Sequence, residues 1–152
     1  MRLTYYTLLF AVIGIVATFL PWVHYPKGDT NLYGYVGDGL ITGFLFFVVT
    51  ILSLYEIIKK KHISAIKIAS GIIGLLMLIL AVNNIFSIEN QKANFETDNP
   101  FIGAAFAGFT QGSGLYVLGI AGIGLLVTNL IGFFKRSKDL ETPHTKKLNF
   151  YV

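Results

Sequence analysis

Histidine and acidic side chains, the usual carriers of chemistry, are scattered along this chain. The three histidines, His24, His62 and His144, lie far apart in the sequence. A metal site needs several ligands at short spacings, and the sequence offers only His24 with Asp29 or Asp38. A serine–histidine–aspartate triad needs a histidine supported by a second element, and no such set is present. We therefore expect no metal or cofactor site and no enzyme activity.

The composition points to a membrane. Cysteine is absent, which excludes disulfides, thiolate metal sites and thiol nucleophiles. Apolar residues make up 54% of the 152 residues and charged residues 13%, against about 25% charged residues in a typical soluble domain. A single domain of this length cannot bury so much apolar surface. Lipid is the simplest medium to cover the excess.

Four apolar runs account for most of the chain. Each is about 18 to 24 residues long, the length that an α-helix needs to cross roughly 30 Å of hydrocarbon. We predict an all-α, integral membrane, up-down-up-down four-helix transmembrane bundle over residues 1–134, without a β domain, and a polar basic tail over 135–152. The predicted spans are residues 3–20, 40–58, 63–86 and 115–134.

Basic residues predict the orientation of these spans. All but Lys27 and Lys92 of the 12 lysines and arginines lie before the first run, around the link between the second and third, or after the fourth. The positive-inside rule then places both termini in the cytoplasm. Because the basic clusters are short segments beside anionic headgroups, the net charge of +4 indicates topology, and nucleic-acid binding is not expected.

Few polar residues fall inside the runs. Glu56 lies near the end of the second run, and we expect it to pair with Lys59–Lys61 at the membrane interface. The amide residues nearest the hydrocarbon, Asn83, Asn84 and Asn129, are expected to hydrogen-bond between helices. Since no ionisable residue lies near the centre of a span, a transport pathway through one chain is not favoured.

Two residues stand out near the ends of the runs that we assign to the outside. Trp22 follows the first run, where amphipathic rings prefer the headgroup layer. Asp38 precedes the second run, where a carboxylate can accept hydrogen bonds from free backbone N–H groups. The link over 59–62 is so short that the second and third helices should be antiparallel neighbours. Small-residue motifs such as Ser70-x3-Gly74 should pack within the bundle, with dimerisation as the alternative.

The second outer loop carries an apolar segment over residues 100–114. Ile102, Phe106 and Phe109 fall at i, i+4 and i+7, on one helical face. The segment is too short to cross a bilayer, so we expect a short interfacial helix that lies on lipid or on the bundle. The alternative is a docking surface for another membrane protein. With Trp22 and Asp38, these three residues are our candidates for interaction.

Short motifs at the run boundaries carry a resemblance. Leu20-Pro21-Trp22-Val23 closes the first run, Gly37-Asp38-Gly39-Leu40-Ile41 opens the second, and Gly112-x-Gly114-Leu115-Tyr116 opens the fourth. In this layout the chain resembles a loose class of small, uncharacterised prokaryotic four-span membrane proteins. The resemblance implies a bacterial or archaeal plasma (inner) membrane and brings no activity. A likeness to claudins is weaker, because their cysteine pair is absent and the first outer loop is too short for their extracellular sheet.

The sequence thus favours a non-enzymatic membrane protein. We expect an accessory subunit, regulator or interaction partner of an envelope complex, whose partners are the lipid bilayer and either another membrane protein or a second copy of the chain. The alternative is a small oligomeric transport or permeation unit.

Overall fold

Four helices and three short strands make up the described part of the chain. The computed structural model describes residues 2–24, 31–36, 38–60, 63–98 and 110–141. The expectation of a mostly helical chain is confirmed, since the strands are short. The helices are α1 (Arg2–Phe19), α2 (Asp38–Lys59), α3 (Ser64–Asp98) and α5 (Ser113–Glu141), and the strands are β1 (Pro21–His24), β2 (Asn31–Tyr33) and β3 (Thr110–Gln111).

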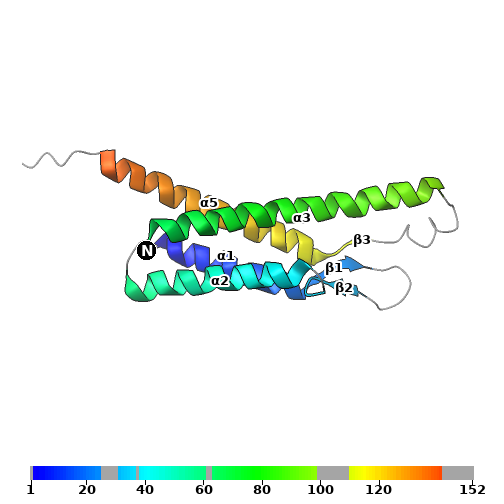
Figure 1. The fold of residues 1–152 in the computed structure, drawn as a ribbon, viewed down its shortest axis with the longest axis horizontal. Coiled ribbons are helices and arrows are strands. Elements are labelled where there is room, and N and C mark those ends of the chain that lie inside the picture. The colour runs from blue at the N-terminus through cyan, green and yellow to red at the C-terminus, as the bar shows by residue number, and fades with distance from the viewer. Residues whose placement is uncertain (1, 25–30, 37, 61–62, 99–109, 142–152) are drawn as a thin grey trace, which may run out of the picture.

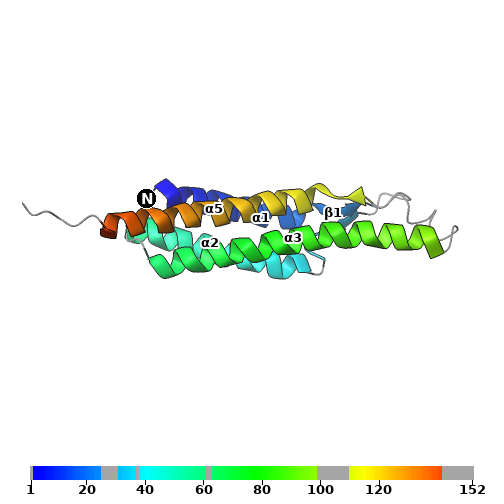
Figure 2. The same cartoon turned by 90° about the horizontal axis from the view of Figure 1, so that it is seen from above.

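The helices lie side by side along the long axis of the molecule, and successive helices run in opposite directions (Figures 1 and 2). α1 packs against both α2 and α5, and α3 packs mainly against α5. α2 and α3 touch much less, although a short link joins them. We expected the link to make them packing neighbours. Their buried faces instead pair α2 with α1 and α3 with α5.

Buried residues recur at alternating three- and four-residue intervals along α2 and α3. This seven-residue repeat turns one narrow stripe of each of these two helices toward its neighbours, as in left-handed helix packing. Many of the buried positions are small or hydroxyl-bearing, so the backbones can approach closely. On α2 the buried residues are Gly39, Thr42, Phe46, Val49, Ser53 and Glu56. On α3 they include Lys67, Ser70, Gly74, Met77 and Ala81.

Glycines allow particular helix pairs to touch. A Cβ atom at Gly74 would lie 2.9 Å from the carbonyl oxygen of Gly122, so α3 and α5 meet backbone to backbone. A Cβ atom at Gly14 would collide with the ring of Phe46, which packs α2 onto α1. Gly74 therefore packs inside the bundle, which is one of the two roles that its small-residue motif predicted.

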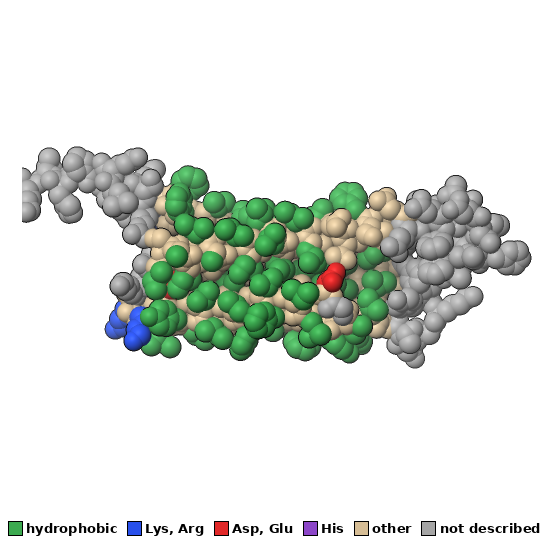
Figure 3. Space-filling view, in the orientation of Figure 1, with side chains coloured by type: hydrophobic (Ala, Val, Ile, Leu, Met, Phe, Trp, Pro, Cys, Tyr) green, Lys and Arg blue, Asp and Glu red, His purple; other side chains and the backbone are tan. Residues whose placement is uncertain are grey.

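Large apolar side chains cover the outside of the bundle. Exposed Leu, Ile, Val and aromatic residues occur on all four helices, with Leu40 at 67% and Ile58 at 75% exposure. Figure 3 shows them spread over the flank of the molecule. The interior contains hydroxyl residues such as Thr42, Ser53 and Ser70. These residues lie beside apolar core residues such as Phe46, Leu118 and Leu125. An exterior as apolar as this one is typical of helices that face lipid.

Three helical segments are long and apolar enough to span a membrane: Asp38–Lys59, Ser64–Asn90 and Ser113–Lys135. The apolar part of α1, Leu3–Phe19, is shorter. Together with the apolar flank, these segments confirm the predicted membrane character and transmembrane helices at this level.

A small antiparallel sheet with the order β2-β1-β3 lies at one end of the bundle. We call this the sheet end, and the opposite end, where the link joins α2 to α3, the link end. The sequence predicted no β domain and did not single out this small sheet, whose strands are only two to four residues long. The first loop supplies only two short strands, and the third comes from the segment before α5.

Two helices continue beyond their predicted spans. α3 reaches Asp98, past the predicted end at Phe86, and α5 reaches Glu141. Hydropathy marks where an apolar run ends, but backbone hydrogen bonding continues until a helix breaker intervenes, and the first after Phe86 is Pro100. The predicted interfacial helix lies outside the described residues, as do its three face residues Ile102, Phe106 and Phe109.

Candidate functional site

The indole ring of Trp22 forms the centre of the sheet end. It is 6% exposed, and its Nε1–H donates a hydrogen bond to the carbonyl oxygen of Ala17 at 3.0 Å. Gly34 and Gly114 lie directly against the ring, because a Cβ atom at either position would overlap it. The two glycines open a space in which the chain itself covers the ring. Its expected position at the headgroup layer stays a prediction.

Backbone hydrogen bonds tie both loops to the end of α1. The Gly34 N–H donates to the Leu20 carbonyl at 3.2 Å, and the Gly112 N–H donates to the Trp22 carbonyl at 2.7 Å. Beside the Gly112 bond, Val23 pairs with Gln111 of β3, and on its other edge β1 pairs with β2. The sheet end therefore has a defined backbone geometry in which each strand is held by its neighbours.

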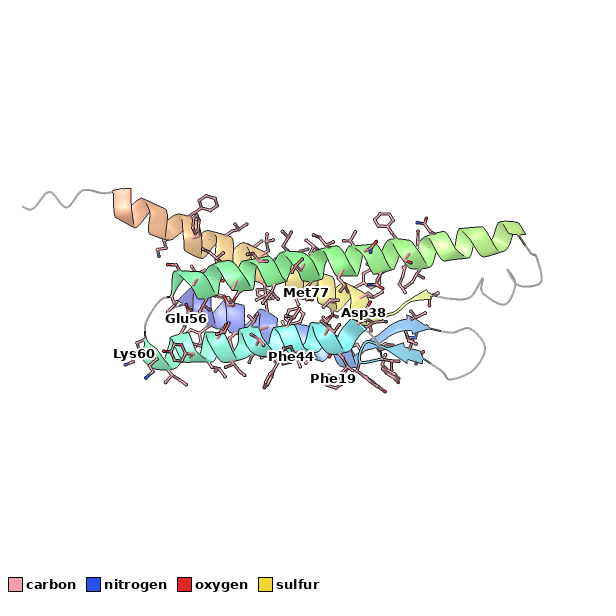
Figure 4. The ribbon with its side chains drawn as sticks, in the orientation of Figure 1. Phe19, Asp38, Phe44, Glu56, Lys60 and Met77 are labelled. Atoms are coloured by element: carbon pink, nitrogen blue, oxygen red, sulfur yellow. The ribbon has the colours of Figure 1, made fainter. Side chains whose placement is uncertain are left out.

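An exposed group of apolar side chains stands at this end. The rings of Tyr33 and Tyr35 stack with centroids 5.6 Å apart, and Phe19 lies 6.4 Å from Tyr35. Phe19 is 63%, Tyr35 45% and Val36 54% exposed, and Figure 4 shows Phe19 pointing away from the bundle. We call Phe19, Tyr33, Tyr35 and Val36 the aromatic face. The sequence did not single it out, because these residues come together only when β2 pairs with β1, next to the end of α1.

The polar candidates at the sheet end, Asp38 and His24, make few hydrogen bonds among the described residues. Asp38 is exposed as the first residue of α2. Its carboxylate accepts no hydrogen bond from the described residues, so the capping bonds that we expected do not form among them. A carboxylate at this position still complements the positive end of the helix dipole. His24 Nδ1 lies 2.9 Å from Asn31 Oδ1 across the β1–β2 pair. The described ranges contain no group of three or more residues suited to hold a metal.

A buried ion pair lies at the link end. Lys67 Nζ of α3 is 3.2 Å from Glu56 Oε2 of α2, and the side chains are 6% and 1% exposed. We expected Glu56 to pair with Lys59–Lys61 at the interface, but Lys59 and Lys60 are exposed and Glu56 turns inward. The buried stripe of α2 explains the difference, since Glu56 continues its three-and-four spacing. Figure 4 shows Glu56 beside the start of α3.

The ion pair is embedded in hydrogen bonds from three parts of the chain. Glu56 accepts the hydroxyl of Thr4 at 3.4 Å and the backbone N–H of Ile63 at 2.9 Å. Lys67 donates to the hydroxyl of Thr7 at 3.4 Å. Taking two charges out of water costs several kcal/mol per ion, and such partners offset the cost. The cluster joins α1, α2 and α3, and it thereby connects α2 and α3, which otherwise touch each other little.

Three buried polar atoms near this cluster make no hydrogen bond to the described residues. They are the hydroxyl oxygens of Ser53 and Ser70 and the amide oxygen of Asn129. Ser53 and Ser70 lie one helical turn from Glu56 and Lys67. Asn129 donates its amide N–H to the Leu125 carbonyl at 2.7 Å, within its own helix instead of between helices as expected. Buried polar atoms of this kind are the usual partners of internal water.

A groove of about 240 Å³ runs between α3 and α5 beside this cluster. Its walls are apolar apart from Lys67 and Asn129. They are formed by Lys67, Ile68, Gly71, Ile72, Leu75, Leu126, Asn129, Leu130 and Phe133. Several of these apolar residues are also exposed on the flank of the molecule, so the groove opens toward the surroundings of the bundle.

Known proteins provide no template for these sites. No family model, no curated protein and no solved structure matches this chain. The sites are therefore assigned from the contacts of their own residues. The signal that could have revealed the buried cluster is the spacing of three between Ser53 and Glu56 and between Lys67 and Ser70, which places the two charged residues on the small-residue stripes.

Proposed function

We propose that the chain crosses the membrane four times. Support comes from the apolar flank and from the length of the apolar segments in α2, α3 and α5. α1 packs between α2 and α5, and its apolar part, Leu3–Phe19, measures about 25 Å at 1.5 Å per residue. A modest tilt of the other helices or local thinning of the bilayer accommodates this shorter span.

The link end faces the cytoplasm in this proposal, together with both termini. Exposed Lys59, Lys60 and Lys135 lie toward that end, and lysines beside the ends of spans are retained on the cytoplasmic side. Glu56 at the same end is paired with Lys67, so it does not offset the exposed charges. In keeping with the resemblance in layout, we assign the chain to the plasma (inner) membrane of a bacterium or archaeon.

We further propose a non-enzymatic role as an accessory subunit, regulator or interaction partner of an envelope complex. The observation that carries this proposal is the aromatic face, exposed at an end whose backbone is held by Trp22 and by strand pairing. Aromatic residues are enriched in protein interfaces. A surface that is already ordered loses less entropy when it binds. The partner is the outer part of another membrane protein or a second copy of this chain.

Cross-linking at the aromatic face tests this role. A photoreactive amino acid at Tyr35 should yield a discrete protein adduct in intact cells, and the double change Tyr35→Ser, Val36→Ser should abolish co-purification of that adducted protein. Tyr55→Ser is the matched control, because Tyr55 is 48% exposed, close to the 45% of Tyr35, but lies in the last turns of α2. Lipid adducts alone at Tyr35, with unchanged partner binding by the double variant, would contradict the role.

A small oligomeric permeation unit is the second candidate. The observation in its favour is the link-end cluster, where an ion pair adjoins buried polar atoms of Ser53, Ser70 and Asn129 that have no partner. Polar and ionisable groups within spans commonly mark ion or proton pathways. Purified protein in sealed liposomes should then conduct ions or protons, and Glu56→Gln with Lys67→Gln should change the flux. No flux above protein-free liposomes would exclude this candidate.

A further inference from the structure

Buried polar side chains continue inward from the ion pair. α2 and α3 run in opposite directions (Figure 1). The step of three residues from Glu56 back to Ser53 therefore leads to the same depth as the step from Lys67 on to Ser70. Each step covers about 4.5 Å along the helix axis at 1.5 Å per residue. Ser53 and Ser70 are 1% and 0% exposed, so both belong to the interior at a common level.

The other two helices contribute polar groups at the same level. The hydroxyl of Thr7 on α1 is 3.4 Å from Lys67 Nζ. On α5, Asn129 lies beside Gly71, the residue after Ser70, because a Cβ atom at Gly71 would be 3.5 Å from Asn129 Cβ. The four side chains at this level are buried, with at most 3% exposed. We call them the polar layer: Thr7, Ser53, Ser70 and Asn129.

Part of the hydrogen-bonding capacity of the polar layer is unused among the described residues. The hydroxyl oxygens of Ser53 and Ser70 and the amide oxygen of Asn129 have no partner there. An ammonium carries three N–H donors, and Lys67 directs two of them to Glu56 and Thr7. Buried polar atoms in folded proteins are nearly always paired, either with protein groups or with ordered water. Unpaired polar atoms that gather at one level therefore indicate a bound polar ligand.

The size and charge of the polar layer select water as this ligand. The layer carries smaller side chains than the levels beyond it, where Phe46 and Leu125 are fully buried. A Cβ atom at Gly71 would make only one ordinary contact, so a group of methyl size fits beside Asn129. A water molecule needs a similar space and about two to four polar partners. A metal cation is disfavoured, because the ammonium of Lys67 would repel it.

We infer that the polar layer binds internal water, which bridges the three unpaired oxygens and hydrates the Lys67 ammonium from inside the bundle. Water reaches the layer from the link end, since the start of α3 is only about 9 Å from Ser70 along the helix. The fully buried Phe46 and Leu125 close the layer toward the sheet end. The inference rests on neither proposed role, because water bound at one end of the bundle requires no partner and forms no path across the membrane.

The thiol of a single cysteine tests for water at this level, because the chain itself contains no cysteine. Ser53→Cys and Ser70→Cys each place one S–H group in the polar layer with little change in size. The purified full chain in phospholipid nanodiscs is transferred to deuterated buffer, and infrared spectroscopy follows the exchange of S–H to S–D. Both thiols should exchange as soon as the buffer changes, because they contact water.

Ala121→Cys is the matched control for a dry position. Ala121 is 0% exposed and lies about 12 Å beyond Asn129 toward the sheet end at 1.5 Å per residue. Its thiol should exchange at least about a hundredfold more slowly, because exchange there requires an opening of the packed core that costs about 3 kcal/mol or more. Circular dichroism and gel filtration must show the three variants helical and monodisperse. If one cysteine variant of the polar layer does not fold, the other tests the same level.

The stability of alanine variants gives a second readout that needs no thiol. If water is hydrogen-bonded to Ser53 and Ser70, then Ser53→Ala and Ser70→Ala each delete a bonded group. Each variant should then lower the free energy of unfolding in mixed detergent micelles. Hydroxyls without a partner would give the opposite result, because alanine would remove a buried unpaired group and leave stability unchanged or raise it.

Three results would overturn the inference. The first is exchange at both serine positions as slow as at Ala121→Cys, which would mean that each hydroxyl bonds to a carbonyl of its own helix. The second is a pair of alanine variants at least as stable as the unmodified chain. The third is equally fast exchange at Ala121→Cys, which would place water along the bundle instead of in the polar layer.

Discussion

The two ends of the bundle close by different physical means. At the sheet end, a neutral indole sits against two glycines, and backbone hydrogen bonds join strands from both loops. At the link end, a buried carboxylate and ammonium join α1, α2 and α3 through side chains. Packing and backbone pairing are insensitive to charge, whereas the ion pair depends on both of its members. Substitutions at the two ends should therefore differ in how much stability they cost and in whether charge determines that cost.

The largest expected difference between the ends is their accessibility. Cysteine is absent from the chain, so single cysteines at the exposed positions Asn31 and Lys60 report the two ends cleanly. With a membrane-impermeant maleimide in intact cells, Asn31→Cys should label and Lys60→Cys should label only after lysis. If both cysteines were labelled from outside, the two ends would lie on the same side of the membrane, which would contradict the four-span orientation.

Breaking the ion pair should have the largest effect on stability. Lys67→Met leaves Glu56 buried without its counter-ion, and removal of one member of such a pair typically costs about 3–5 kcal/mol of the free energy of unfolding. The double change Glu56→Gln, Lys67→Gln removes both charges and should recover most of this loss. Reversible unfolding in mixed detergent micelles measures both. If the double variant were no more stable than Lys67→Met, an unpaired buried charge would not be the cause of the lost stability at the link end.

Loss of the indole hydrogen bond should have a smaller effect. Trp22→Phe removes the donor to the Ala17 carbonyl, which keeps the hydrogen bond from the Leu20 N–H at 3.3 Å. We expect a loss of about 0.5–1.5 kcal/mol in the same unfolding measurement, because one hydrogen bond is lost but no buried group is left without a partner. Raising the salt concentration should not alter this difference. A salt-dependent loss would mean that electrostatics also acts at the sheet end.

The smallest predicted effect is a gain. Lys60 follows the last residue of α2 with φ at 49°, in the left-handed region. A side chain costs about 1 kcal/mol there, and glycine is preferred at this position after a helix. Lys60→Gly should therefore raise the free energy of unfolding by up to about 1 kcal/mol, although the chain loses one basic charge at the link end. A lower stability would show that the charge of Lys60 outweighs its backbone strain.

Prediction from the sequence was accurate where a single physical rule acts along the chain. Long apolar runs must become helices in lipid, because every backbone group has to be hydrogen-bonded internally. The membrane character and the approximate location of α2, α3 and α5 follow from that rule alone. The ends of α3 and α5 do not, because helical hydrogen bonding continues into polar sequence after hydropathy has fallen.

The features missed by the sequence depend on contacts between distant segments. The sheet needs β3, which lies far from β1 along the chain, so the first loop by itself gave no sign of it. The burial of Trp22 depends on Gly34 and Gly114 from two other segments. Glu56 was assigned to the interface because lysines follow it in sequence, whereas its partner Lys67 begins the buried stripe of the next helix.

The small residues in the buried stripes make the interior of the bundle sensitive to added volume, whereas its exterior accepts exchanges among large apolar side chains. In a water-soluble domain, surface positions vary freely and the centre resists loss of volume. Here the exterior already carries large apolar groups, so exchanges among them leave the bundle intact, while one added methyl group at Gly74 or Gly122 meets backbone atoms. In related chains, glycine, serine and threonine along the stripes should therefore persist while the bulky exterior drifts.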